Sequence, residues 1–360
     1  MKIRLFEDLL DPTLETASSA VQLWPSASIT QHIAWPSVAV PSRLQRYLAF
    51  SCADEAGQTI SVGCVRLTQL WRGRFSASIR RGPCTQSPED LGRVMPVLEA
   101  ALHRYGAISI SANPIWKDED AQTCESVLVQ MGYKRVPEYE QTLPTATALV
   151  DVQVSEEDLL RSFSNRRKRD LRAARADNML VRPVESIDEA VRLTTIMREM
   201  AKRTGLEIDG RHDFRAQFHF FKERPHLGLI NVASLDGQIV GGSVSFIEGD
   251  RSLLNIVTAV PGLKGGRSTS LYWQAMLDAK NRGCRWLDLD GYPDPREPSD
   301  PCEAGRQEFK DSYRPQIVTL PPMMSRVLRP IEALTYRKIR RLYRQSKWKT
   351  QIKALLQRSD

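Results

Sequence analysis

Apolar and polar residues alternate in three segments of the first half of the chain, and this pattern predicts β-strands. The segments are RYLAFSCA at 46–53, TISVGCVRLTQL at 59–70 and GRFSASIR at 73–80. They are rich in β-branched and apolar residues, and turn residues separate them, so we expect an antiparallel meander. The pattern then changes to a helical period at 88–105, where Ser87 and Pro88 provide a start signal. A strand at 107–112, a helix at 118–131 and a strand at 132–136 complete a β-α-β-α-β order.

The second half repeats this order of elements. Helical periods occur at 188–205 and 215–224, and three strands with tight turns at Asp236-Gly237 and Gly249-Asp250 follow in 227–260. An amphipathic helix at 270–283, a strand at 284–291 and a short helix at 306–313 come next. The repetition predicts an α/β protein of two tandem modules, each with a mixed, mostly antiparallel sheet flanked by helices.

The length of 360 residues agrees with two domains of ordinary size. We place the first module at residues 1–145, the second at 146–322 and a basic helical tail at 323–360. A joint rich in Pro and Thr at 137–152 marks the first boundary. The tail carries eleven Lys or Arg between Arg326 and Arg358 but one acid, Glu332. Such a helix suits contact with RNA or phospholipid, and a solvated basic helix explains it equally well.

Composition and charge limit the classes of protein to which this chain can belong. No apolar run is long enough to span a membrane, and the acidic start MKIRLFEDLLD is unlike a signal peptide, so we expect a cytoplasmic protein. The six cysteines form no CxxC pair, which is typical of reduced thiols without a zinc site. The net charge of +8 favours a polyanionic partner.

Many of the positively charged residues lie in one short segment of the chain. Residues 161–182 hold eight Lys or Arg against two acids. In a helix, Lys168, Arg172 and Arg175 have the spacing i, i+4 and i+7, so they point to one side. A polyanion site and a solvated helix face are both consistent with this cluster.

Familiar catalytic and metal motifs are missing from the sequence. His212, His219 and His226 are seven residues apart, which is too far along a helix for them to share one ion. The glycines of VPGLKGGRST at 260–269 fit a phosphate loop or a plain glycine-rich connection. Acetyltransferases that use coenzyme A, however, carry Arg or Gln three residues before the first glycine of their pyrophosphate loop. This chain has Ala259 there if the first glycine is Gly262, and Gly262 there if it is Gly265. We therefore expect neither a metal nor a bound cofactor.

Candidate chemistry gathers in WLDLDGYPDPREPSDPCEAGRQEFKDSYRP. Trp286, Asp288 and Asp290 alternate on a strand and so face one side, just before the carboxyl end at which open α/β sheets bind ligands. Phe309 and Lys310 follow after a polar loop. Asp and Gly are also common in tight turns, and a turn is the alternative explanation for Asp290-Gly291.

Together these residues resemble the Fem family, aminoacyl-tRNA-dependent peptidyltransferases with an acetyltransferase (GNAT)-like fold that act on peptidoglycan precursors. The resemblance is carried by TQHIAW at 30–35, RRGP at 80–83, RDLRAA at 169–174, VASLDGQIVGGSVSF at 232–246, LYWQAM at 271–276, LDLDGY at 287–292 and EFKDSY at 308–313. These segments span most of the chain.

The resemblance implies specific roles. Phe309 and Lys310 occupy the family's Phe-Lys position, where Lys310 stabilises the oxyanion or the tRNA 3′ end. Substrate-binding residues are expected at Arg211, Arg215, Tyr272, Trp286, Asp288 and Asp290, and tRNA-binding residues at Arg166, Arg167, Arg169 and Arg172. Aminoacyl-tRNA is the expected co-substrate, and an amine-bearing precursor or small peptide is the expected acceptor. The chain has Ala39, Arg215 and Ile256 where the family has a lysine and two tyrosines, which favours an unusual acceptor.

Two other functions fit the sequence. An acyl-CoA-dependent N-acyltransferase is compatible with the same fold. A non-catalytic protein that binds RNA or a membrane is compatible with the basic tail.

Overall fold

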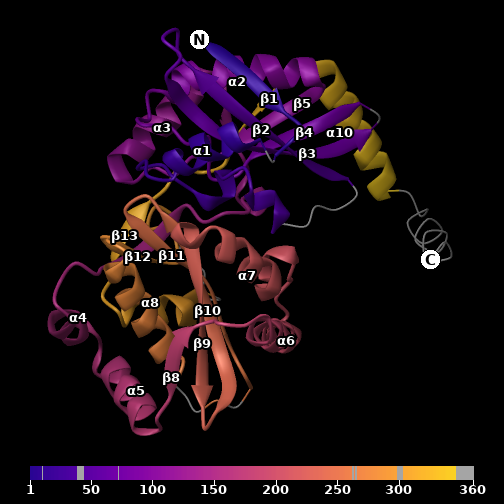
Figure 1. Ribbon diagram of the computed structural model, residues 1–360. Coiled ribbons are helices and arrows are strands. Elements are labelled where there is room, and N and C mark those ends of the chain that lie inside the picture. Colours follow the sequence, from indigo (N-terminus) through magenta and orange to yellow (C-terminus); the bar gives the residue numbers. More distant parts are fainter. Residues whose placement is uncertain are drawn as a thin grey trace.

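Two α/β modules follow one another along the chain, and Figure 1 draws the first in indigo and purple and the second in magenta and orange. The computed structural model describes residues 1–345, apart from residues 10, 39–43, 72, 262, 264–265 and 298–302. Each module is built on a seven-stranded mixed sheet with helices packed on it. The predicted fold class, two tandem modules with mostly antiparallel sheets, is confirmed.

The first sheet has the strand order β1-β2-β3-β4-β5-β14-β6. Strands β1 to β4 form an antiparallel meander, and β4 pairs in parallel with β5 after the crossing helix α2. The strands are β1 (Lys2–Phe6), β2 (Gln45–Ala53), β3 (Thr59–Trp71), β4 (Arg74–Ile79), β5 (Ala107–Ala112), β6 (Lys134–Arg135) and β14 (Met324–Val327). The helices are α1 (Pro12–Val21), η1 (Ile29–Gln31), η2 (Trp35–Ser37), α2 (Leu91–Tyr105), α3 (Asp118–Gln130) and η3 (Glu138–Glu140).

Alternation along β2 explains how the helices cover this sheet. Leu48 and Phe50 lie in one core with α2 and α3, whereas Ala49 lies in another core with α1. Successive side chains of a strand point to opposite faces, so α1 covers one face of the sheet and α2 with α3 covers the other.

The second sheet has the strand order β13-β7-β12-β11-β10-β9-β8. Strands β9, β10 and β11 form an antiparallel meander, and β11 pairs in parallel with β12 after helix α8. The strands are β7 (Ala146–Asp151), β8 (Leu180–Pro183), β9 (Gly228–Leu235), β10 (Gln238–Glu248), β11 (Arg251–Ala259), β12 (Trp286–Gly291) and β13 (Gln316–Thr319). The helices are α4 (Glu156–Ser162), α5 (Asn165–Ala176), α6 (Ile187–Thr204), η4 (Gly210–His212), α7 (Phe214–Glu223), η5 (Pro225–Leu227), α8 (Thr269–Asn281) and α9 (Ala304–Asp311).

A shared apolar core joins the two modules. Trp35 of the first module packs edge-on against Phe220 of α7 at 5.6 Å and against Phe246 of β10 at 5.1 Å between ring centroids. Helix η1 contributes Ile29 to the same core, together with residues of α6. Aromatic pairs at these distances stabilise a contact beyond the area that they bury. This core fixes the first module against the α6 and α7 face of the second sheet.

One strand from the end of the chain joins the sheet of the first module. Strand β7 precedes the second module's helices and lies between β12 and β13, whereas β14 follows the second module and lies between β5 and β6 of the first. Residues 324–327, expected as part of a helical tail, are thus a strand of the first sheet. Helix α10 (Pro330–Gln345) lies along the first module, where Figure 1 draws it in yellow, and its Glu332 forms an ion pair with Arg74. Residues 346–360 of the expected tail lie outside the described residues.

Candidate active site

Strands β11 and β12 run parallel but separate before they end. They pair with each other only from Arg251 and Trp286 to Leu253 and Asp288, whereas along their other edges β12 pairs with β7 and β11 with β10 up to the ends of the strands. At the separation, β11 has an extra residue, Asn255, in its pairing with β10. Such a β-bulge bends a strand and re-aims its side chains. A gap therefore opens at the carboxyl ends of two parallel strands, where α/β sheets bind ligands.

The first module is closed at the equivalent place. Strands β4 and β5 stay paired from Phe75 and Ala107 to Ile79 and Ala112. The other edge of β5 pairs with β14. The open gap in the second sheet therefore identifies the second module as the one that carries the candidate site.

A cavity of about 280 Å³ lies between the modules beside this gap. Its walls come from residues 28–30 and strand β4 of the first module, from the joint before β7, and from β10, β11 and β12. Its charged lining residues are Arg80, Arg81, His212, Glu248, Arg251, Asp288 and Asp290. Two of the predicted substrate-binding residues, Asp288 and Asp290, thus lie in one cavity.

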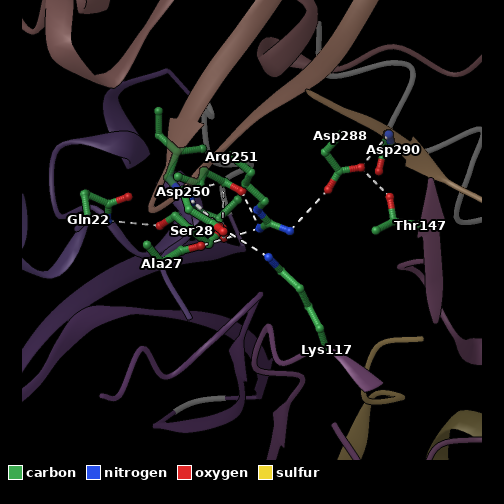
Figure 2. Close-up of polar contacts among 12 residues, drawn as sticks. Gln22, Ala27, Ser28, Lys117, Thr147, Asp250, Arg251, Asp288 and Asp290 are labelled. Atoms are coloured by element: carbon green, nitrogen blue, oxygen red, sulfur yellow. Dashed lines mark hydrogen bonds and ion pairs between the residues drawn. The ribbon is translucent and has the colours of Figure 1, made fainter. Parts of the chain in front are cut away.

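A buried cluster of charges forms the floor of this cavity (Figure 2). The Arg251 guanidinium donates to Glu248 at 2.6 Å and to Asp288 at 3.2 Å, and all three side chains are almost fully buried. Burial alone lowers the pKa of Arg251, but Glu248 and Asp288 more than offset this, so its pKa lies above the usual value. Removing one partner from such a buried pair typically costs about 3–5 kcal/mol.

The same cluster attaches the β10–β11 hairpin to the first module. Glu248 accepts hydrogen bonds from Ser28 Oγ at 3.1 Å and from the Ile29 amide at 2.8 Å. Asp288 accepts from Thr147 Oγ1 of β7 and, at 2.8 Å, from the backbone amide of Asp290. The carboxylates of Glu248 and Asp288 are therefore occupied by structural contacts, as Figure 2 shows for Asp288.

Arg81 and Asp290 also line the cavity, and both adopt an uncommon backbone conformation. Their φ angles are 53° and 61°, in the left-handed region that favours glycine. Non-glycine residues stay there when their surroundings hold them, and they are often found at functional sites. The Arg81 amide donates to Asn113 Oδ1 at 2.9 Å. Burial lowers the pKa of Arg81, and the nearby Asp290 opposes this shift.

Lys310 lies at the carboxyl end of β12, next to Asp290. Its ammonium donates to the carbonyl of Asp290 at 2.8 Å and to the carbonyl of Gly291. Burial lowers the pKa of Lys310 below its usual 10.5, although Asp290 and Asp288 raise it. An ammonium has three N–H donors, so one donor remains for a ligand.

A second cavity of about 380 Å³ lies at the carboxyl end of β11. Tyr272 of α8 and Phe309 of α9 form one wall, with their ring centroids 5.0 Å apart. Burial raises the pKa of Tyr272 to about 12, while Arg167 lowers it. Phe309 faces this second cavity, and the next residue, Lys310, contacts the strand whose Asp290 lines the first cavity. Helix α9 therefore lies between the two cavities.

Three predicted substrate-binding residues lie elsewhere or outside the described part. Trp286 lies at the amino end of β12, under the Arg285 guanidinium at 4.8 Å, and Asp290 is about 13 Å further along the strand. Arg215 is exposed at the start of α7, and its guanidinium is held by Asp213 at 2.7 Å. The backbone of Arg211 lies in η4, but its side chain, like residues Ala39, Gly262 and Gly265, is outside the described residues.

The predicted tRNA-binding arginines divide into two sets on helix α5. Arg166, Arg169 and Arg172 are exposed. Arg167 is 5% exposed, donates to Thr269 Oγ1 at 3.0 Å and lies over the Phe309 ring at 4.8 Å. Arg167 therefore belongs to the wall behind Phe309 and not to the exposed basic face.

A second group of basic residues, which shares Arg172 with the first, lies on the side of α5 that faces α4. Lys168, Arg172 and Arg175 line one groove of about 280 Å³ against α4. Leu160 and Leu171 form the apolar part of this groove. The three basic residues thus lie together, as their i, i+4 and i+7 spacing predicts.

Arg81, Glu248 and Arg251 are site residues that the sequence analysis did not predict. Arg251 follows the Gly249-Asp250 turn at the start of an otherwise apolar strand, and a charge at such a buried position is a usable signal. Glu248 precedes the same turn. Arg81 belongs to the RRGP segment, but nothing in the sequence places that segment opposite Asp290.

Within the described residues, no group of three or more His, Cys, Asp or Glu side chains is arranged to hold a metal ion. No helix there is long and apolar enough to cross a membrane.

Comparisons with known proteins agree with this architecture. Residues 161–310 match a family model described as an acetyltransferase (GNAT) domain. The structure of FemX superimposes with a TM-score of 0.76 at 13% sequence identity, over 93% of this chain and 100% of FemX. L-PGS from Bacillus licheniformis superimposes with a TM-score of 0.53 at 13% identity, over 93% of this chain and 98% of L-PGS. A comparison with curated protein sequences finds no match. The chain therefore shares the fold of FemX, which agrees with the resemblance that the sequence motifs indicate.

Proposed function

We propose that this protein is an acyltransferase that moves an amino acid from aminoacyl-tRNA onto an acceptor amine and forms an amide bond. The observation that carries the proposal is that Lys310 donates to the carbonyl of Asp290, which lines one cavity, while the adjacent Phe309 lines another. One cavity lies between the modules and contains Asp290, and the other lies beside Phe309 and Tyr272. The similarity in fold to FemX and the GNAT family model support the same reaction class.

In this proposal the aminoacyl ester occupies the cavity beside Phe309 and Tyr272. Aromatic rings there offer a stacking surface for the terminal base of a single-stranded 3′ end. The exposed Arg166, Arg169 and Arg172 of α5 contact tRNA phosphates, and these contacts make binding sensitive to salt. No cofactor is required, because the ester is already an activated acyl donor.

The acceptor amine enters from the cavity between the modules. Its nitrogen attacks the ester carbonyl carbon, the new C–N bond forms, and the C–O bond to the terminal ribose breaks. The amine releases a proton and the ribose oxygen takes one up, so the reaction is balanced. The free N–H of Lys310 stabilises the oxyanion of the intermediate, an effect for which one donor is typically worth about 10²–10³ in rate. An amine of pKa near 8 is partly neutral at pH 7, so positioning can replace a general base.

The acceptor in this proposal is a peptidoglycan precursor or a specialised small peptide or amine. The basic C-terminal segment is a candidate for peripheral contact with an anionic membrane surface, where such precursors are found. Aminoacyl transfer at this location predicts a cytoplasmic enzyme.

A second candidate function is acyl transfer from coenzyme A, which the acetyltransferase description of the matching family model favours. One experiment separates the two. The protein is incubated with charged bulk tRNA or with acetyl-CoA, each with free amino acids, dipeptides and a nucleotide-linked stem peptide as acceptors. We expect product from charged tRNA, and no product after ribonuclease treatment. Product that survives ribonuclease and depends on acetyl-CoA would replace the proposal with the second candidate.

A further inference from the structure

The charged residues around the cavity between the modules differ in whether they have partners. Arg251, Glu248 and Asp288 satisfy one another and their neighbours. His212 contacts Asp209 at 3.2 Å, and Arg80 has contacts of its own. Among the described lining residues this leaves Arg81 and Asp290.

Arg81 carries an unsatisfied donor in this cavity. Its Nη1 atom is buried and has no hydrogen-bond partner. A buried N–H without a partner is costly, and the cost is higher when the group is charged. Residues that remain unsatisfied in the absence of a ligand are expected to bind one. A carboxylate or a phosphate has the charge and the geometry that a guanidinium prefers.

Asp290 provides the opposite charge on the other wall. Its backbone amide and carbonyl are used by Asp288 and Lys310, whereas its carboxylate has no ion pair within the described residues. Asp290 also raises the pKa of Arg81, so the two charges interact, yet no ion pair joins them directly. Beside the lining charges that have contacts of their own, the cavity thus presents the Arg81 guanidinium and the Asp290 carboxylate.

The size of the cavity limits what can bridge this gap. A volume of about 280 Å³ corresponds to roughly nine water molecules at about 30 Å³ each, which is the scale of an amino acid or dipeptide. The charge of Arg251 is balanced by two carboxylates, so this guanidinium adds no net positive charge for a polyanion such as pyrophosphate.

We propose that this cavity binds the acceptor as a small zwitterion, a free amino acid or a dipeptide, with its carboxylate on Arg81 and its ammonium on Asp290. The inference rests on the proposed function, because it takes the cavity as the acceptor site. In this orientation the amine lies next to Lys310, whose ammonium donates to the carbonyl of Asp290 at 2.8 Å. The bound ammonium releases one proton to solvent before it attacks, and the neutral amine is then held at the carboxyl end of β12, beside Lys310.

Isothermal titration calorimetry on the full-length chain tests this proposal without requiring turnover. The probes are the twenty proteinogenic amino acids and Ala-Ala, followed by the carboxamide and the N-acetyl derivative of the tightest binder. We expect each derivative to bind about 10- to 100-fold more weakly, because each leaves one buried charge without its partner.

Two variants assign the two charges. Arg81→Gln should remove the preference for the carboxylate over the carboxamide, and Asp290→Asn should remove the preference for the free amine over the N-acetyl form. Matched controls are Arg314→Gln and Asp236→Asn, because both residues are exposed and have similar φ angles of 55° and 51°. The controls should bind like the wild type.

The possible results separate this proposal from the proposed function. Equal loss of affinity for the amino acid and its carboxamide in Arg81→Gln would assign Arg81 to the shape of the cavity and overturn the proposal. Transfer onto a nucleotide-linked peptide, without binding of any probe, would also overturn it while leaving tRNA-dependent transfer intact. Binding with both preferences, but without transfer from charged tRNA, would support the zwitterion site and reject the proposed function.

Discussion

Lys310 is the residue whose substitution should have the largest effect on catalysis. Its ammonium contacts the end of β12 between the two cavities and keeps one N–H for the reacting ester. We expect Lys310→Ala to lower the single-turnover rate by about 10²–10³, the usual effect of losing one oxyanion donor. The rate and the melting temperature are measured on the same preparation.

Lys280→Ala is the matched control for this prediction. Lys280 is half-buried and also donates to a backbone carbonyl, that of Val154 at 2.6 Å, but it lies at the far end of α8 from the gap. The control should keep the wild-type rate. A wild-type rate in Lys310→Ala would remove this residue from the catalytic centre.

The burial of Lys310 predicts a particular pH dependence. Its pKa lies below 10.5, so the cation is lost as the pH rises through this lowered value. The transfer rate should therefore fall on the alkaline side before an ordinary lysine would titrate. Lys310→Arg should move this fall to higher pH, because arginine stays charged. Rates are corrected for uncatalysed ester hydrolysis at each pH, and an unshifted profile in Lys310→Arg would contradict the assignment.

The same shift has a defined effect on stability. The folded protein binds the Lys310 proton more weakly than the unfolded chain does, so the buried cation destabilises the fold below its folded pKa. This penalty disappears as the pH rises toward the unfolded value of about 10.4. Lys310→Met should lack this rise in stability over the same alkaline window.

Arg167 shows what the sequence reveals at the scale of single residues. It shares one helix face with Leu171 and Ala174, both buried, at spacings of four and seven. That apolar stripe was a signal that Arg167 points inward, but the density of charge around it concealed the pattern. The position of Arg81 and Asp290 in one cavity had no such signal, because the two residues are more than two hundred positions apart and are brought together when the modules dock.

At the scale of elements, the β10–β11 hairpin is the main polar contact between the modules. Gly249 at its tip has a φ of 60°, and a Cβ there would lie 2.7 Å from the Trp24 carbonyl oxygen. Gly249→Ala should therefore cost the backbone strain of about 1 kcal/mol and a steric term of about 1–3 kcal/mol more. Thermal unfolding followed by tryptophan fluorescence should report a lower melting temperature.

The neighbouring hairpin provides the control. Gly237 has a φ of 75° in the β9–β10 turn, and a Cβ there meets nothing within 4 Å. Gly237→Ala should thus show the backbone strain alone. If both variants melt at the same temperature, the hairpin tip does not hold the modules together in the way that its contacts with Trp24 and Gln22 indicate.

The elements differ in how well the sequence predicts them. Strands β2 and β3 have nine and thirteen residues, and β4 alternates regularly over six; all three are rich in apolar and β-branched residues and are flanked by turns, so their pattern identified them. Strand β1 has five residues and β14 has four. So short an alternation cannot be distinguished from coil or from the start of a helix, because stable pairing comes from distant partners. The break in pairing between β11 and β12 depends on the bulge at Asn255, which leaves no mark in the sequence pattern.

At the scale of the whole molecule, β14 ties the end of the chain to the first module. It pairs with β5 from Met324 and Ala112 to Val327 and Ser109, and it also pairs with β6. Met324 is 1% exposed in the first core, and Arg326 forms an ion pair with Glu99 at 2.7 Å. The first module is therefore complete only after the second module has been synthesised, which no internal repeat in the sequence could indicate.

Two truncated chains test this dependence, since their ends differ by six residues. A chain that ends at Arg329 keeps β14, whereas a chain that ends at Met323 lacks it, and both lack α10. Without β14, the amides of β5 lose their partners on one side and β6 loses its place in the sheet. We expect hydrogen exchange at Ser109 to Ala112 to become fast in the shorter chain, because local protection follows local stability. The second module's sheet contains neither β14 nor its partners β5 and β6, so the hydrogen-exchange protection of that sheet should be the same in both chains. Equal protection of β5 in both truncated chains would mean that the first sheet is stable without β14. The pairing of β14 with β5 and β6 would then not link the two modules energetically.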